Sequence, residues 1–139
     1  MRWLKLKGYA SLFNVRDISG DVVKPGAFAK SLAARNGPLP LLLSHETTNP
    51  VGVWTDVRED SKGLYVEGRL YLDEERGRLA ARMVQTNQIR GLSIGFRTAD
   101  HERREDGRDL TEIDLWEISI VGFPMLTGAR ITDVEEEGD

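Results

Sequence analysis

Alternation of apolar and polar residues is the commonest pattern along this chain. The clearest stretch runs from Leu64 to Leu72, where every second residue is apolar or glycine. A period of two turns one set of side chains toward a core and the other toward solvent, which predicts a half-buried strand. Six less regular stretches have the same character and bring the expected number to about seven strands: 3–13, 22–23, 39–45, 51–57, 90–99 and 113–123.

Two segments have helical spacing instead. Pro25 stands where a first helical residue is favoured, and the helix expected from it ends near Arg35. A second helix is expected after Asp73, which can cap it. Because the helices do not alternate regularly with the strands, βαβ units are not expected. The pattern predicts a mainly β fold, a small barrel with two or more helices packed outside. The second helix should bury an apolar stripe formed by Leu79, Ala80, Met83 and Val84.

Composition narrows the class of protein. With 139 residues, of which 40% are hydrophobic and 30% charged, we expect one globular domain over 1–132. The segment 133–139 is mostly acidic and is expected to form a disordered tail. The formal net charge of −4 argues against a nucleic-acid partner, and the lack of cysteine excludes disulfides, a thiolate metal site and a cysteine nucleophile. No signal peptide or membrane-length apolar run is present, so we expect a soluble cytoplasmic protein without a membrane partner.

One serine stands out in the stretch from Arg90 to Arg97. Apolar residues alternate there with Ser93, which lies between two glycines and falls on the less apolar face of the predicted strand. Small neighbours leave room for a substrate backbone to approach the hydroxyl. The Gly-x-Ser-x-Gly pattern does not indicate an α/β-hydrolase elbow, because a strand pattern continues past Ser93 and the only later histidine is His101. Ser93 is therefore either a small structural residue of the sheet or a nucleophile.

The two histidines are the candidates for a general base. His101 lies in a charged segment and is expected to be an exposed residue of a hairpin tip. His45 closes an apolar strand, on the face of Leu41 and Leu43, and precedes a polar turn. It is either a structural histidine or a base that is open to substrate. Two distant histidines give no metal-binding spacing, so neither a metal nor a cofactor is expected.

Glu117 is the third candidate. It has the parity of Ile113, Leu115 and Val121 in an otherwise apolar strand, where a carboxylate must be paired or hydrogen-bonded. One reading is an ion pair with an arginine such as Arg97 or Arg90. The other is that Glu117 accepts the imidazole N–H of His45 and stabilises the imidazolium formed when Ser93 loses its proton.

Several blocks of the chain together resemble the prohead (capsid-maturation) serine proteases of tailed bacteriophages. That family is similar in fold to the herpesvirus assemblins, in which a β-barrel is ringed by helices. The resemblance implies that Ser93 is the nucleophile, His45 the general base and Glu117 the third member, where assemblins carry a second histidine. It also makes the backbone around Gly122 and Phe123 the candidate oxyanion hole. The matching blocks are Gly20–Val23, Pro25–Phe28, Pro40–His45, Pro50–Gly52, Gly91–Phe96 and Glu117–Val121.

The resemblance implies a serine endopeptidase of capsid maturation. Its expected substrates are scaffold segments and the major capsid protein, inside the immature prohead in the host cytoplasm, with a phage or prophage as source. Self-cleavage is also expected and, by analogy with assemblins, assembly as a homodimer or higher oligomer. Because histidine titrates near pH ~6.5, activity should be lost on acidification through that range. The rival hypotheses are a non-catalytic module that binds capsid or scaffold chains, and a small esterase.

Overall fold

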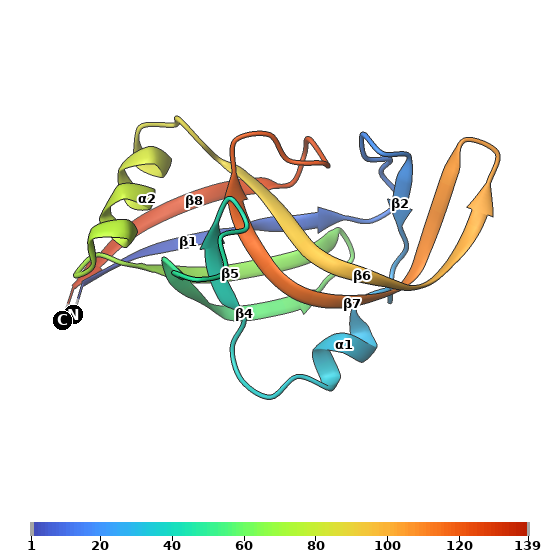
Figure 1. The fold of residues 1–139 in the computed structure, drawn as a ribbon, viewed down its shortest axis with the longest axis horizontal. Coiled ribbons are helices and arrows are strands. Elements are labelled where there is room, and N and C mark those ends of the chain that lie inside the picture. The colour runs from blue at the N-terminus through green and yellow to red at the C-terminus, as the bar shows by residue number, and fades with distance from the viewer. Residues whose placement is uncertain (1, 139) are drawn as a thin grey trace.

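The protein, described over residues 2–138 by a computed structural model, is built mainly from strands (Figure 1). Two helices accompany an eight-stranded sheet in this part of the chain, against about seven strands expected. The elements, in order, are β1 (Arg2–Leu12), β2 (Asp21–Val23), α1 (Ala29–Ala33), β3 (Pro40–Leu43), β4 (Gly52–Glu59), β5 (Gly63–Tyr71), α2 (Glu75–Gln85), β6 (Gly91–Arg104), β7 (Gly107–Val121) and β8 (Arg130–Gly138).

The strand pairings run in a ring. The sheet order is β2-β7-β3-β4-β5-β1-β8-β6, and β6 pairs in turn with β7. The join between β6 and β8 is a single residue pair, Gly91 with Arg130, whereas β6 and β7 pair along almost their whole lengths. β7 is central to this arrangement, because it also pairs in parallel with β2 and β3. Residues far apart in sequence therefore meet on β7.

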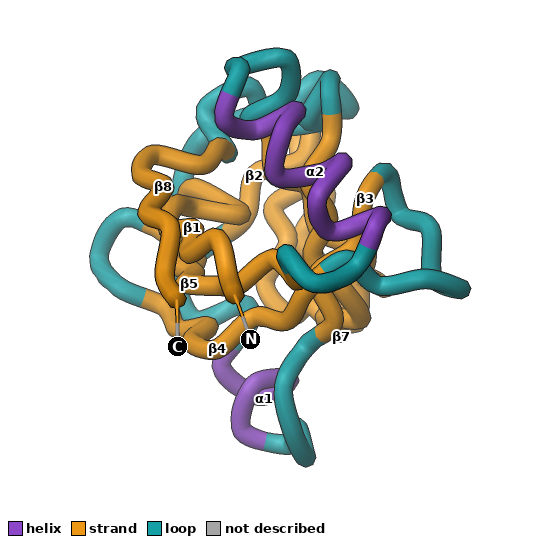
Figure 2. Tube along the Cα trace, turned by 90° about the vertical axis from the view of Figure 1, so that its left-hand side faces the viewer, coloured by secondary structure: helices purple, strands orange, loops and turns teal. Residues whose placement is uncertain are grey.

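The core lies where the alternating strands turn their apolar side chains inward. On β5, Leu64, Val66 and Leu70 are fully buried, as the period of two predicted. α2 packs at one end of the ring, while α1 lies against β4 and β7 (Figure 2). The predicted apolar stripe of α2 was only partly right: Ala80 and Val84 are buried, but Leu79 is exposed.

A glycine decides how α2 is turned. A Cβ at Gly77 would lie 1.8 Å from the carbonyl oxygen of Tyr71, so the backbone of the helix touches the end of β5 at this position. The close approach brings Gly77 and Ala81 into the contact surface and rotates Leu79 toward solvent. The sequence periodicity alone did not predict that a glycine would make the close contact between α2 and β5.

α1 is shorter than predicted because the first turn of the expected helix bends away. Gly26 has a φ of 91°, and the carboxylate of Glu59 accepts hydrogen bonds from the backbone N–H groups of Gly26 and Phe28. The segment around α1 also covers an open stretch of the β7 edge. There the Ser31 hydroxyl accepts the N–H of Leu115 at 2.9 Å.

The C-terminal segment corrects a prediction. Residues 133–138, expected to be disordered, belong to β8 and pair with β1, while Asp139 lies outside the described residues. The acidic side chains of β8 face a basic strand: Glu135 lies opposite Lys5, and Asp133 opposite Lys7. Opposite charges across an antiparallel pair stabilise it. A charge run that would repel itself in isolation is thus accommodated beside β1.

The β6–β7 hairpin is longer than the alternation suggested. Pairing continues to Arg104 opposite Gly107, so the charged segment around His101 is strand rather than loop. The hairpin projects from the body (Figure 1), and the side chains from Ala99 to Arg104 on β6 are exposed, which removes the apolar signal. Arg108 pairs with Asp21 through two hydrogen bonds of 2.9 Å, joining the hairpin to β2. Within residues 2–138, neither helix has the length and apolarity that crossing a bilayer requires.

Candidate active site

Ser93 lies on the outer face of β6, as its alternation predicted. Its neighbour Leu92 belongs to the core, whereas Ser93 keeps 9% of its surface accessible. It is directly opposite Ser119 on β7, and directly opposed residues of antiparallel strands share a face, with Cβ atoms about 4.5–5.5 Å apart. Among the described residues, no hydrogen bond occupies the Ser93 hydroxyl.

Glu117 is preceded by a β-bulge. Gly95 lies opposite Glu117 and Phe96 lies opposite Leu115, so Trp116 is one extra residue on β7. A bulge bends the strand and changes the direction in which the next side chain points. Gly95 provides the space for the result, since a Cβ there would lie 2.2 Å from Glu117 Oε1.

The bulge reverses which residues of β7 face the core. Ile113 and Leu115 are core residues before it, and Ile118 and Ile120 are core residues after it. Glu117 therefore does not share a face with Ile113 and Leu115, and that part of the sequence prediction was wrong. The prediction applied strict alternation across Trp116, where the strand carries one extra residue.

His45 is also redirected relative to its strand. β3 ends at Leu43, and Ser44 and His45 have φ values of 52° and 61°. Such left-handed residues cost of order 1–3 kcal/mol each unless the surroundings hold them. Here the Ser44 N–H donates to the Ile120 carbonyl at 2.9 Å. The turn carries His45 off the core face of Leu43, where continued alternation would have placed it, and against β7, where its backbone N–H meets the Ser119 hydroxyl.

Three side chains form a connected group on this face. His45 Nδ1 contacts Glu117 Oε1, and the Ser119 hydroxyl donates to Glu117 Oε2 at 2.7 Å. The backbone N–H of His45 donates to the same hydroxyl at 3.0 Å. The carboxylate is enclosed, with 10% of its side chain exposed, while the imidazole is 46% exposed. Because Nδ1 faces a carboxylate, it carries the hydrogen, and Nε2 is left as the basic nitrogen.

Arg97 and Arg90, the two arginines proposed as ion-pair partners of Glu117, have other contacts. Arg97 lies 3.8 Å from Asp114, and Arg90 donates to the carbonyl of Val84 at 3.2 Å. Within residues 2–138 neither arginine is paired with Glu117, whose side chain contacts His45 and Ser119 instead. The ion-pair reading is therefore not the arrangement that the structure has.

The structure brings Ser93, His45 and Glu117 onto one face, but in two different ways. His45 and Glu117 are in direct contact, whereas Ser93 is placed by its register opposite Ser119. No hydrogen bond joins Ser93 to His45 in the part of the chain described. Hydrogen bonds between catalytic groups often shorten only when substrate binds. The arrangement offers a free hydroxyl, a half-exposed imidazole and a buried carboxylate on one face of the sheet.

The other predicted positions take no part in the contacts among His45, Glu117 and Ser119. Gly122 and Phe123 follow β7 where it pairs with Gly91, two residues before Ser93, and the Phe123 side chain is almost fully exposed. His101 is exposed on the projecting hairpin. No group of histidine and acidic side chains within residues 2–138 is arranged to hold a metal ion.

Ser93 also lines a mainly apolar cavity of about 80 Å³. The cavity lies between β6, the end of β1 and the loops that follow β1 and β7. Its walls include Val15, Leu92, Ile94 and Met125. The candidate nucleophile therefore borders a space that suits a small apolar side chain.

Ser119 is the residue of this site that sequence reasoning missed. It lies two positions after Glu117, so a period of two puts both side chains on the same face. That spacing could have signalled a partner for the carboxylate. The sequence prediction treated the strand as apolar apart from Glu117 and gave Ser119 no role.

The fold is of a class found in solved viral proteases. The chain is similar to the KSHV protease in complex with a hexapeptide phosphonate inhibitor, with a TM-score of 0.65 and 14% identity, covering 99% of this chain and 66% of that one. It is also similar to the capsid assembly protease of bacteriophage T4, with a TM-score of 0.67 and 14% identity, covering 84% and 80% of the two chains. At such low identity the likeness establishes the fold.

Sequence comparison gives the family. The profile of the caudovirus prohead serine proteases matches residues 2–139, and the chain belongs to that family. It is 38% identical over 122 residues to the prohead protease of Enterobacteria phage HK97, covering 85% of this chain and 54% of that protein. It is 31% identical over 123 residues to the capsid polyprotein of Pseudomonas phage PAJU2, covering 83% of this chain and 18% of the polyprotein. The family predicted from sequence is confirmed, and the chain spans about half the length of the HK97 protease.

Proposed function

We propose that this chain is a serine endopeptidase of phage capsid maturation, with Ser93 as nucleophile, His45 as general base and Glu117 as the acid that orients the base. The single observation that carries the proposal is the contact between His45 Nδ1 and the buried Glu117 carboxylate, on the face that bears Ser93. A pure binding module gains nothing from an enclosed carboxylate that holds a half-exposed imidazole.

The proposed reaction uses His45 Nε2, the ring nitrogen that does not face Glu117. His45 Nε2 takes the proton from the Ser93 hydroxyl as the oxygen attacks the scissile carbonyl. Glu117 stabilises the resulting imidazolium through Nδ1–H. The imidazolium then gives the proton to the leaving amine, and an acyl-enzyme on Ser93 remains. A water molecule, deprotonated by His45, hydrolyses the acyl-enzyme and restores the serine.

Backbone N–H groups near Gly122 and Phe123 are the proposed oxyanion hole. Their support is position: the loop from Gly122 to Pro124 lies against Gly91, where a Cβ would lie 2.7 Å from the Pro124 ring. The ring of strand pairings and the fold of the two solved proteases support the small assemblin-like barrel predicted from sequence.

The proposed substrates are scaffold and major capsid protein segments inside the immature prohead, together with the protease chain itself. Support comes from the family and from relatives that are a prohead protease and a capsid polyprotein. Because Ser93 borders an apolar cavity, we expect a small apolar side chain next to the scissile bond. We also propose that the chain assembles as a homodimer. The proposed reaction involves neither nucleic acid nor a membrane.

Incubation with the capsid and scaffold proteins of the same phage tests the proposal. The chain should cleave them at discrete sites that mass spectrometry can map, and it should shorten itself with time. Ser93→Ala should abolish both cleavages without changing the circular dichroism spectrum. Activity should also fall on acidification between about pH 8 and 5, as expected of a reaction that uses a histidine as general base.

Two results would contradict the proposal. Cleavage that survives in Ser93→Ala would show that another nucleophile or a contaminating protease is responsible. Stable binding to scaffold without cleavage, under all conditions that keep the chain folded, would favour the non-catalytic module. Turnover of simple aryl esters with no cleavage of peptides would favour an esterase.

A further inference from the structure

Ser119 has no part in the three-residue site inferred from sequence, yet it is the residue that joins the acid to the backbone of the base. It is fully buried on β7, directly opposite Ser93. Its hydroxyl donates to Glu117 Oε2 at 2.7 Å and accepts the His45 N–H at 3.0 Å. One hydroxyl thus uses its donor on the acid and an acceptor lone pair on the base.

We propose that Ser119 is a positioning residue of the reaction, acting through the His45–Glu117 pair; the inference rests on the proposed function. Glu117 uses its two oxygens for two different partners, Oε1 for His45 and Oε2 for Ser119. A carboxylate with a single partner can turn about its last side-chain bond. The second hydrogen bond fixes the plane of the carboxylate and therefore the orientation of the imidazole.

The second contact of Ser119 acts on the backbone. Ser44 and His45 both have left-handed backbone conformations, which are unfavourable for residues other than glycine. The N–H of His45 has turned out of the strand ladder and donates to the Ser119 hydroxyl. Ser119 therefore helps to hold the turn that brings His45 to the outer face.

The Ser119 hydroxyl also reduces the negative charge on Oε1 of Glu117. A donor on Oε2 draws negative charge away from Oε1, so its removal should strengthen the attraction between the carboxylate and an imidazolium. Glu46 follows His45 in sequence, and Arg76 of α2 lies 2.8 Å from Glu46. These two are left untouched when Ser119 is substituted.

The chain offers a direct readout, because it has two histidines and only one belongs to the site. The imidazole titrations of His45 and His101 can be followed by NMR and assigned with His101→Ala. In Ser119→Ala the pH dependence of the His45 signals should differ from that of the wild type, while that of the His101 signals stays unchanged. Ser31→Ala is the matched control, since it also removes a hydroxyl bonded to β7, at Leu115, without touching the site.

Kinetics on a mapped capsid peptide supply the second readout. We expect Ser119→Ala to lower kcat by about 100-fold with KM nearly unchanged, because a misplaced base affects the transition state more than substrate binding. Ser119→Thr keeps the hydroxyl and should restore most of kcat. Ser119→Cys, a weaker donor of similar shape, should give an intermediate loss and serves if the alanine variant does not fold.

The proposal is overturned if His45 titrates identically in the wild type and in the Ser119 variants, or if Ser119→Ala lowers kcat no more than Ser31→Ala does. An absence of hydrolysis by the wild type would contradict the proposed function instead. The NMR titration would then still decide whether Ser119 controls the His45–Glu117 pair.

Discussion

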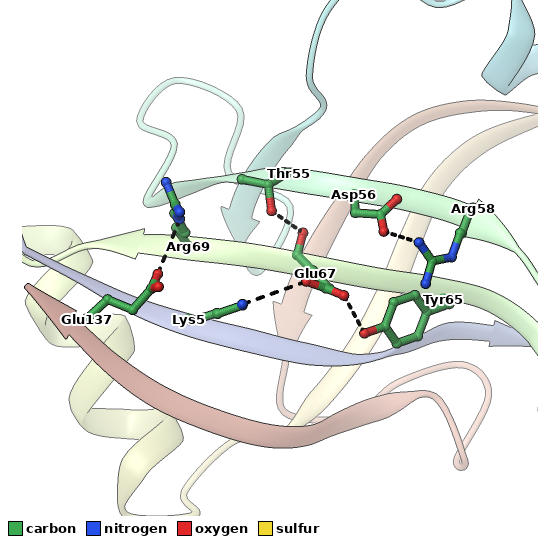
Figure 3. Close-up of polar contacts among 8 residues, drawn as sticks. All are labelled: Lys5, Thr55, Asp56, Arg58, Tyr65, Glu67, Arg69 and Glu137. Atoms are coloured by element: carbon green, nitrogen blue, oxygen red, sulfur yellow. Dashed lines mark hydrogen bonds and ion pairs between the residues drawn. The ribbon is translucent and has the colours of Figure 1, made fainter.

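Two groups of polar side chains face outward from the same sheet and are satisfied in different ways. The first, here called the ladder face, crosses β1, β4, β5 and β8 (Figure 3). On it Glu67 accepts the Tyr65 hydroxyl at 2.7 Å and lies 3.9 Å from Lys5 Nζ, and Arg69 lies 3.4 Å from Glu137. The second is the candidate site, where one enclosed carboxylate serves His45. The full ladder face consists of Lys5, Thr55, Asp56, Arg58, Tyr65, Glu67, Arg69 and Glu137.

The difference lies in the backbone as much as in the charges. Tyr65, Glu67 and Arg69 follow one another on β5 at a strict period of two. Glu117 and His45 reach their positions through a bulge and a left-handed turn. Partly exposed ion pairs contribute about 0–1 kcal/mol and can be exchanged for others. The site has no such redundancy, so substitutions in the two regions should have very different consequences.

The largest contrast is expected between two glutamates. Glu117→Gln should lower kcat by about 10⁴-fold, because a neutral amide no longer stabilises the imidazolium or selects the tautomer of His45. Glu67→Gln on the ladder face should leave kcat within a factor of two. Peptide-cleavage kinetics on both variants make the comparison. Equal losses in the two would mean that Glu117 acts only as a surface charge.

Gly95→Ala should have the next largest effect. A Cβ there would lie 2.2 Å from Oε1 and 2.8 Å from Cγ of Glu117, so the acid must move while the backbone can stay. We expect kcat to fall by about 100-fold, the cost of a displacement of about 1 Å. Thermal unfolding followed by circular dichroism should show a folded protein. Unchanged activity would show that Glu117 has no fixed position to lose.

A smaller effect is expected where β8 joins the ladder face. A double-mutant cycle with Arg69→Gln and Glu137→Gln, measured by urea unfolding, should give a coupling energy of about 0.2–1 kcal/mol, with peptide cleavage unaffected. The cycle also tests the C-terminal strand directly. A coupling of zero would indicate that this end of β8 is not held against β5 in solution.

The smallest effect is a loss of stability in alkali. Burial, with the hydrogen bond to Glu67, raises the pKa of Tyr65 to about 12 from the usual value of about 10 for a phenol. A raised phenol pKa means that the folded state favours the neutral form, so the contribution is complete below pH 10 and is lost as pH rises toward 12. The free energy of unfolding should therefore fall more between these values in the wild type than in Tyr65→Phe. Solvent around the ladder face keeps the difference small.

Much of the fold could be predicted from the sequence, because burial imposes a period of two. The strand from Leu64 to Leu72 was predicted almost to the residue. The prediction failed where charge hid the pattern: residues 133–138, expected to be disordered, form part of β8, and the paired strands of the β6–β7 hairpin extend beyond 90–99 and 113–123. In both places a polar strand is stabilised by its neighbour, and the neighbour is not visible in a local window of sequence.

Within the site, the sequence by itself determined the residue types, the two available histidines and the outward face of Ser93. It also carried the family resemblance. The tertiary structure alone decided where His45 and Glu117 point, since the turn after β3 and the bulge at Trp116 each reverse the face that simple alternation assigned. Left-handed turns and bulges are held by contacts with distant strands, here the Ile120 carbonyl and the Ser119 hydroxyl. A local pattern contains no record of such contacts, so only the folded chain could bring acid and base together.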